Sequence, residues 1–392
     1  MGIAVVFPGQ GTQQPGMALP WRDHPAWRVI DAADAALGEP LGELVTTAPA
    51  EALTRTREAQ LAVLLTSLVA WTALEPTLDE APVAFAGHSL GQVTALIAAG
   101  VLTVEEGVRF AARRAELTQA AADAHPGKMA ALLGATPEQA EQACTVAPDS
   151  CWVANDNAPG QVVIAGTPEG LEKGTAHAQE IGVRRVTALN VGGAFHTPLM
   201  ADATAALETE VAGMHFTVPA APVVSNDDAV AHPDAEGWRT RLPRHVSVPV
   251  RWRTTMETLT GLGATTFLEV GHGSMLAALA KRRARRDRPQ HLDSRRPHPF
   301  PGGALMEALL THGEGLLVPE RMIVSPTVGV FRPLEDLDEG TEVDAGQTVG
   351  HLDGPGTSTP VCSPFSGRLV GMLVHKGERL REGQPVAWLR VA

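Results

Sequence analysis

The chain has 392 residues, 44% of them hydrophobic, and a formal net charge of −13 at pH 7. This length allows two or three domains with a substantial core, and the acidic balance argues against a general nucleic-acid or anionic-membrane binder. The three cysteines include no CxxC pair, which favours a reducing cytoplasm and no metal site.

The first predicted element is a short buried strand at residues 3 to 7, and no basic segment of a signal peptide precedes it. Gln10 lies in the turn-rich loop that follows. Functional loops of open α/β sheets lie at the carboxyl ends of the strands, so we expect this loop beside the others that carry chemistry. Residues 59 to 74 form the longest apolar stretch. Its glutamine, threonines and serine favour a buried helix over a membrane span.

A Gly-x-Ser-x-Gly pattern at residues 87 to 91 follows an apolar run and precedes a helical pattern closed by Gly100. This context is typical of a nucleophile elbow, because small residues allow a tight turn that exposes the hydroxyl. Ser89 is therefore the candidate nucleophile, and the Leu90 backbone N–H is a candidate donor to an oxyanion. The alternative is a serine that only caps the helix.

The next helix is predicted through residue 117 and contains Arg113 and Arg114. Adjacent helical residues point to different sides, so one arginine can be solvated while the other faces the site. Residues 127 to 191 then show a β-α-β-β-α-β order, which predicts a ferredoxin-like subdomain inserted into a larger α/β domain. His196 follows in a glycine-rich connection, where it can serve as the base for Ser89.

The C-terminal part differs in composition. Residues 291 to 318 are rich in proline, arginine and histidine, which indicates a linker. The basic run at 281 to 296 is either a solvated face or an attraction for an acidic partner. Within residues 319 to 392, the segment 340 to 352 matches 377 to 389 at an offset of 37, which predicts an all-β domain with two equivalent halves.

Several motifs together resemble the malonyl-CoA:acyl carrier protein transacylase family over about residues 3 to 290. They are Phe7–Gln13, Gly87–Gly91, Asn157–Gly166, Ala194–His196 and Phe267–Gly273, with Arg114 placed 25 residues after Ser89. The resemblance implies an α/β-hydrolase-like acyltransferase core in residues 1 to 290. It also implies Ser89 as the acylated nucleophile, His196 as the base and Arg114 as the clamp for the malonyl carboxylate.

The resemblance further implies malonyl-CoA and holo acyl carrier protein as partners, in fatty-acid or polyketide synthesis. No cofactor, nucleic acid or membrane is expected. Gln10 and Leu90 would contribute to the oxyanion site, and Phe195 would leave little room for an α-methyl group. Two positions depart from the family pattern. Gln92 replaces a usually acidic residue, and Arg251 stands where a backbone carbonyl is expected to orient His196.

The C-terminal β domain resembles biotinyl/lipoyl carrier domains, which are flattened barrel sandwiches. Gly356 lies near the place of the modified lysine, and Lys376, the lysine of this module, lies in the other half. We therefore expect a docking module or relic without biotin or lipoate. Two alternatives to malonyl transfer stay open: an acyl-thioester hydrolase on the same scaffold, and a non-catalytic scaffold that docks carrier proteins.

Overall fold

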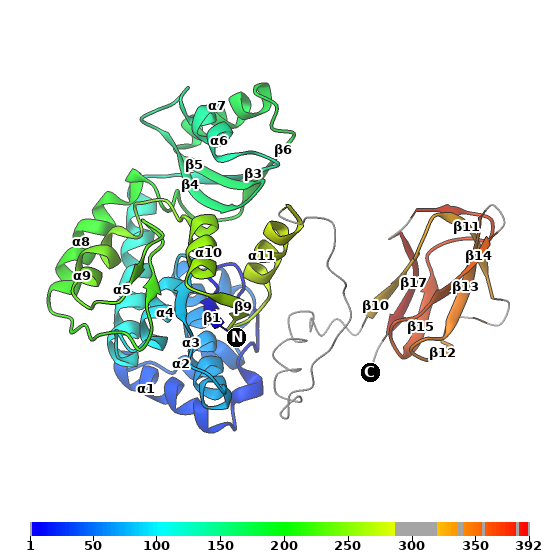
Figure 1. Ribbon diagram of the computed structural model, residues 1–392, viewed down its shortest axis with the longest axis horizontal. Helices are drawn as coiled ribbons and strands as arrows, with labels where there is room; N and C mark the ends of the chain where they lie inside the picture. The colour runs from blue at the N-terminus through cyan, green and yellow to red at the C-terminus, as the bar shows by residue number, and fades with distance from the viewer. Residues whose placement is uncertain are drawn as a thin grey trace. The chain divides into compact units, whose positions relative to one another are not determined.

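The computed structural model describes residues 2–286 and 320–390, apart from residues 335, 336, 338, 339, 355, 356, 382 and 383. The chain forms two compact units, Met1–Pro297 and His298–Ala392 (Figure 1). The predicted linker at 291 to 318 lies outside the described residues.

A five-stranded sheet forms the centre of the first unit, in the order β8-β7-β2-β1-β9. Its strands are β1 (Gly2–Phe7), β2 (Ala84–Gly87), β7 (Val223–Val224), β8 (Ala231–His232) and β9 (Ala264–Glu269). β1, β2, β7 and β9 are parallel, and β8 is the antiparallel edge strand. The loops after the four parallel strands therefore meet at one edge of the sheet.

Helices bury both faces of this sheet. On one face, Ala4 and Val6 pack with α10 (Trp252–Gly261) and α11 (Met275–Arg286). On the other, Trp71 of α3 (Thr56–Leu74) contacts the rings of Phe7 and Phe85 edge-on. The remaining helices of the layers are α1 (Arg28–Leu37), α2 (Leu41–Thr46), α4 (Gly91–Ala98), α5 (Val104–Ala124), α8 (Ala201–Ala212) and α9 (Gly237–Arg244).

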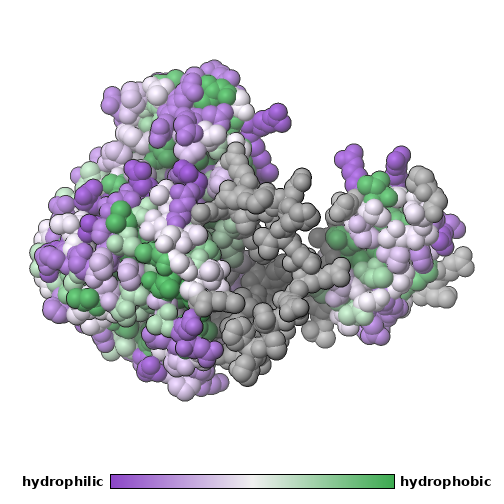
Figure 2. Space-filling model, viewed as in Figure 1, coloured by the Kyte–Doolittle hydropathy of each residue, from purple (hydrophilic) through white to green (hydrophobic). Residues whose placement is uncertain are grey.

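The helix α3 is long and apolar enough to span a membrane by length and composition, but 83% of its apolar window is buried in the protein. The buried helix predicted at residues 59 to 74 is thus confirmed. The chain also forms short 3-10 helices at Leu19–Trp21, Pro25–Trp27, Ala52–Thr54, Glu75–Thr77 and Pro198–Met200. On the face drawn in Figure 2, hydrophobic residues of this unit appear as small areas among hydrophilic ones.

A second sheet, with strand order β4-β5-β3-β6 and antiparallel pairing throughout, forms a subdomain of the first unit. Its elements are β3 (Lys128–Leu133), α6 (Pro137–Cys144), β4 (Cys151–Ala158), β5 (Gln161–Gly166), α7 (Pro168–Glu180) and β6 (Arg185–Leu189). This is the split β-α-β-β-α-β arrangement. In Figure 1, α6 and α7 cover the face directed away from the central sheet.

The second unit consists of two four-stranded antiparallel sheets around one buried apolar cluster. One sheet has the order β10 (Glu320–Val324), β17 (Pro385–Arg390), β15 (Gly367–Met372), β12 (Glu342–Val343). The other has the order β14 (Thr357–Cys362), β13 (Thr348–Gly354), β11 (Gly329–Pro333), β16 (Arg379–Leu380). The sequence repeat places β12 onto β16 and β13 onto β17, so each half of the unit contributes strands to both sheets.

Candidate active site

The turn between β2 and α4 holds Ser89 in a left-handed conformation, with φ of +52°. A methyl group on Gly87 would overlap the Gly91 carbonyl, and one on Gly91 would overlap the Phe7 carbonyl. Both positions therefore require glycine because neighbouring backbone atoms lie too close for a side chain. The positive φ angle of this turn belongs to Ser89 and not to a glycine. Among the described non-glycine residues, His196 and Ala229 also have positive φ. Such backbone strain persists only where the surrounding structure holds it.

Ser89 and His196 form a hydrogen-bonded pair, with Oγ 2.7 Å from Nε2. The other ring nitrogen, Nδ1, lies 3.0 Å from the His245 carbonyl oxygen and 3.2 Å from that of Val248. Carbonyl oxygens only accept, so Nδ1 carries the hydrogen and Nε2 is free to accept the serine proton. Burial, with a smaller contribution from the Arg114 charge, lowers the pKa of His196 to about 3 and keeps the imidazole neutral.

Arg251 does not orient His196, so that expectation is wrong. Its carbonyl accepts from the Thr255 N–H, in the first turn of α10, and is not directed at the imidazole. Its exposed guanidinium donates through Nε to the Asp227 carbonyl at 2.8 Å. The helix begins directly after Arg251 and draws this carbonyl into its own hydrogen bonding.

Arg114 is 5% exposed and donates through Nη1 to Gln60 Oε1 at 2.6 Å and through Nη2 to Ser89 Oγ at 3.3 Å. Among the residues that the structure describes, its Nε has no hydrogen-bond partner and no carboxylate forms an ion pair with it. Burial lowers its pKa to about 10. The neighbouring Arg113 is exposed and pairs with Glu116 and Glu210. The site therefore presents a buried cation without an anion, which favours an anionic ligand.

The other predicted residues lie on the segments that carry or adjoin Ser89, His196 and Arg114. Gln10 Oε1 lies 3.5 Å from Gln60 Nε2, so the loop after β1 connects to Arg114 through Gln60. Leu90 is the N-cap residue of α4, and its side chain is buried. Phe195 is half-buried and packs against the apolar face of the subdomain sheet. Gln10 is thus linked to Arg114 through Gln60, Leu90 belongs to the elbow, and Phe195 directly precedes the base in the chain.

Sequence reasoning missed three polar residues that support the site. Gln60 is a buried polar residue of the largely apolar α3, and the sequence already shows a glutamine in that apolar stretch. Asn157 Oδ1 of the subdomain accepts from His88 Nε2 at 2.8 Å, and burial lowers the pKa of His88. Asn226 follows β7, at the edge where functional loops gather, and bonds to the Ser89 N–H.

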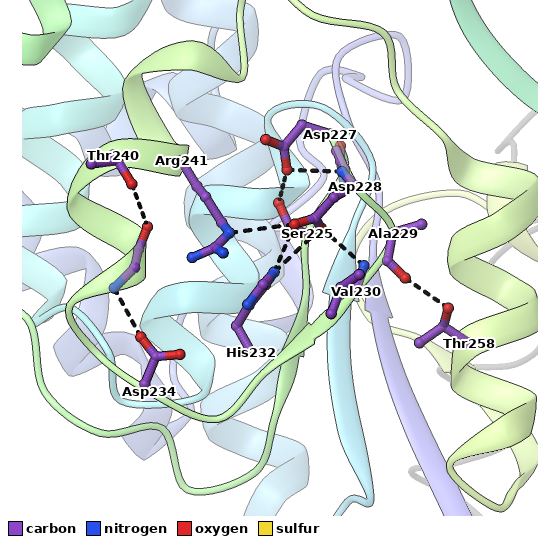
Figure 3. A network of polar contacts seen from close by, with 12 residues as sticks. Ser225, Asp227, Asp228, Ala229, Val230, His232, Asp234, Thr240, Arg241 and Thr258 are labelled. Carbon is purple, nitrogen blue, oxygen red and sulfur yellow. Dashed lines mark hydrogen bonds and ion pairs between the residues drawn. The ribbon is translucent and has the colours of Figure 1, made fainter.

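A polar network secures the loop after Asn226 (Figure 3). Asp227 Oδ1 accepts from the Ser225 hydroxyl and from the Asp228 N–H. The Asp228 carboxylate lies 3.0 Å from His232 Nε2 on β8 and 3.5 Å from Arg241 Nε on α9. The turn is thus attached to two further elements.

No group of three or more His, Cys, Asp or Glu residues that could hold a metal ion occurs in the part of the chain that the structure describes. All three cysteines are free. Cys144 and Cys151 are buried with their sulfurs 3.6 Å apart, and Cys362 is exposed.

Comparisons with known proteins show the family of this chain. A family model for the acyl transferase domain matches residues 4–292. The malonyl CoA-acyl carrier protein transacylase of Salmonella typhimurium is 36% identical over 284 residues, which cover 71% of this chain and 92% of the relative.

Two solved structures are similar to this chain, each with a TM-score of 0.70. One is a type II polyketide synthase acyl-carrier protein in complex with its malonyl-transacylase, at 35% identity, and the other is an acyl carrier protein S-malonyltransferase from Vibrio cholerae, at 34% identity. In both comparisons the match covers 73% of this chain and 94% of the solved chain.

Proposed function

Because this chain belongs to the acyl transferase family and is an acyl carrier protein S-malonyltransferase, we propose that it carries the malonyl group on Ser89. The enzyme transfers malonyl from CoA to acyl carrier protein, in the synthesis of fatty acids or polyketides.

In the first half-reaction, Ser89 Oγ attacks the thioester carbonyl carbon of malonyl-CoA, and its proton passes to His196 Nε2. The Leu90 N–H and the Gln10 loop stabilise the negative oxygen of the tetrahedral intermediate. The carbon–sulfur bond then breaks, and the CoA thiolate takes the proton from His196. Malonyl-serine and CoA thiol result.

In the second half-reaction, the phosphopantetheine thiol of acyl carrier protein gives its proton to His196 and attacks the malonyl-serine carbonyl. The ester bond breaks, and Ser89 recovers the proton from the imidazole. Two carbonyls hold the hydrogen on Nδ1 of the neutral imidazole, so no carboxylate is needed to select this tautomer. Nε2 can then accept a proton and return it in each half-reaction.

The observation that carries the proposal is the buried guanidinium of Arg114, which has no carboxylate partner among the described residues. Its free Nε and its Nη2, beside Ser89 Oγ, offer two N–H groups to the malonyl carboxylate. An acetyl group would leave the cation buried without an anion. Phe195, next to the base, would restrict an α-methyl group and so favour malonyl over methylmalonyl.

The test is the intact mass of the protein after incubation with malonyl-CoA, in parallel with acetyl-CoA and methylmalonyl-CoA. We expect a malonyl adduct that is lost when holo acyl carrier protein is added, while the carrier gains the same mass. Ser89→Ala is the control and should form no adduct. An adduct lost equally fast to water would support the hydrolase, and no adduct on the wild-type protein would support the docking scaffold.

For the second unit we propose a biotinyl/lipoyl-like barrel sandwich that docks partners and carries no biotin or lipoate. The equivalence of β12 with β16 and of β13 with β17 supports this assignment. Lys376 is exposed but lies in the half opposite the carrier position, and Gly356 lies outside the described residues. The free cysteines are consistent with a cytoplasmic location, which we also propose. Truncation near residue 315 with transfer activity retained would identify the unit as separable.

A further inference from the structure

We propose that Asn226 is a positioning residue. Its buried side-chain amide fixes the position of the nucleophile Ser89 relative to the base His196. This inference rests on the proposed roles of Ser89 and His196 and adds a residue to them. Asn226 follows β7 at the carboxyl edge of the central sheet and is 0% exposed.

The side-chain amide of Asn226 is fully used. Its Oδ1 accepts from the Ser89 N–H at 2.8 Å and from His245 Nε2 at 2.8 Å. Its Nδ2 donates to the Gly87 carbonyl at 2.7 Å and to Gln92 Oε1 at 3.0 Å. The backbone N–H of Ser89 can only donate and the carbonyl of Gly87 can only accept, so the orientation of the amide is determined.

Two of these bonds close the elbow. They hold the carbonyl of Gly87 and the N–H of Ser89, the groups on either side of His88. Ser89 occupies a left-handed conformation that a serine adopts only when its surroundings enforce it. Asn226 supplies that constraint and thereby places Oγ at 2.7 Å from His196 Nε2.

The third bond reaches the base. His245 donates through Nε2 to Asn226, and the backbone carbonyl of the same His245 accepts from His196 Nδ1 at 3.0 Å. The His245 Nδ1 has no partner among the described residues, and burial keeps the pKa of this ring well below its usual value. The ring is therefore neutral with its hydrogen on Nε2, as the bond to Asn226 requires.

Gln92 completes the network from α4. Its Oε1 accepts from both the backbone N–H and Nδ2 of Asn226, each at 3.0 Å, whereas its Nε2 has no partner in the described structure. Replacing Gln92 by glutamate would therefore keep both bonds to Asn226 and add a negative charge. Replacing Asn226 by aspartate would remove the donors to Gly87 and Gln92 at almost constant volume.

The first variant is Asn226→Asp. We expect kcat for CoA release from malonyl-CoA to fall by about 10²-fold, because a small misplacement of the reacting groups is that costly. KM for malonyl-CoA should stay near the wild-type value, since Arg114 and Gln60 are untouched. The matched control is Asp228→Asn, which weakens the outer network of Figure 3 without touching the elbow. It should lower the melting temperature and leave kcat unchanged.

The second variant, Gln92→Glu, tests the coupling if Asn226→Asp does not fold. The added charge should stabilise the imidazolium of His196, which already faces the charge of Arg114 and the rings of His88 and His245. The acid limb of kcat/KM should therefore move to higher pH. An unmoved limb would contradict the link from Gln92 through Asn226 and His245 to the base, because a carboxylate added on that chain must favour the imidazolium of His196.

A fluorophosphonate separates this inference from the proposed function. Ser89 Oγ attacks phosphorus, fluoride leaves and the proton passes to His196, so labelling reports nucleophile activation without any malonyl group. Wild type that labels but forms no malonyl adduct would overturn the proposed function alone. Folded Asn226→Asp that labels at the wild-type rate would overturn the role of Asn226, and a rate lower by about 10²-fold would support it.

Discussion

Replacement of Arg114 by methionine tests the central electrostatic claim, that this cation has no anion in the free enzyme. Burial lowers its pKa from the usual value of an arginine to about 10. This corresponds to about 3 kcal/mol, since a tenfold change in an ionisation constant is worth about 1.4 kcal/mol. A lowered pKa in a basic group means that folding is opposed at every pH below about 10. This cost is relieved only as the pH rises from there toward the usual pKa of arginine.

Arg114→Met should therefore be nearly neutral for stability. Removing the charge recovers about 3 kcal/mol, and leaving Gln60 Oε1 without its donor costs about 1–3 kcal/mol. The free energy of unfolding should thus stay level or rise by up to about 2 kcal/mol. Breaking a buried ion pair would instead cost about 3–5 kcal/mol. Urea unfolding at pH 7 distinguishes the two cases.

Arg114→Met should leave stability nearly unchanged but should strongly reduce the preference for malonyl-CoA over acetyl-CoA. The malonyl carboxylate loses two hydrogen bonds to a charged group, each worth about 1.5–3 kcal/mol, so kcat/KM for malonyl-CoA should fall by about 10²-fold or more. Acetyl-CoA makes no such bonds and should not lose activity. CoA release from each thioester measures the ratio.

Arg113→Met is the control, because Arg113 is the exposed neighbour on the same helix and forms only surface ion pairs. Its effect on stability should stay below about 1 kcal/mol, with the malonyl preference intact. If Arg114→Met lost 3 kcal/mol or more, or kept the malonyl preference, the reasoning from the unpaired cation would be refuted.

Three further predictions follow from the site. The acylation kcat/KM should show no acid limb between pH 5 and 7, because the pKa of His196 is about 3 and the base is lost only on acidification toward that value. In the pH profile of kcat, the acid limb should lie at higher pH. Bound malonyl neutralises the Arg114 charge, which is one cause of the lowered pKa of His196. Arg251→Gln should change kcat less than twofold, on the order expected of an exposed side chain, as stopped-flow CoA release can measure. A thiol reagent should modify Cys362 in the native protein and reach Cys144 and Cys151 only after unfolding.

The elbow was predictable because its signal is local. A strand, two glycines around Ser89 and a helix occupy consecutive residues, and the close approach of Gly91 to the Phe7 carbonyl explains why a side chain is not tolerated there. Arg114 was not predictable from helical spacing alone and came from the family resemblance, whereas His196 was already the candidate base from its place in a glycine-rich connection. The helix period allowed either Arg113 or Arg114 to face the site, and packing against Gln60 selects Arg114.

The partner of His196 could not be obtained from sequence, because a backbone carbonyl has no residue signature. Val248 and Arg251 lie three residues apart, and only the path of the backbone decides which carbonyl reaches His196. The Val248 carbonyl accepts from His196 Nδ1, whereas the Arg251 carbonyl accepts from the first turn of α10. Asn226 was hidden for a related reason. Its role depends on contacts with residues 137 and 134 positions away along the chain, to Ser89 and Gln92. Parallel strand order, which brings β7 beside β2, creates those contacts, so the elements that carry the site follow from sequence patterns while the atoms that align it follow from topology.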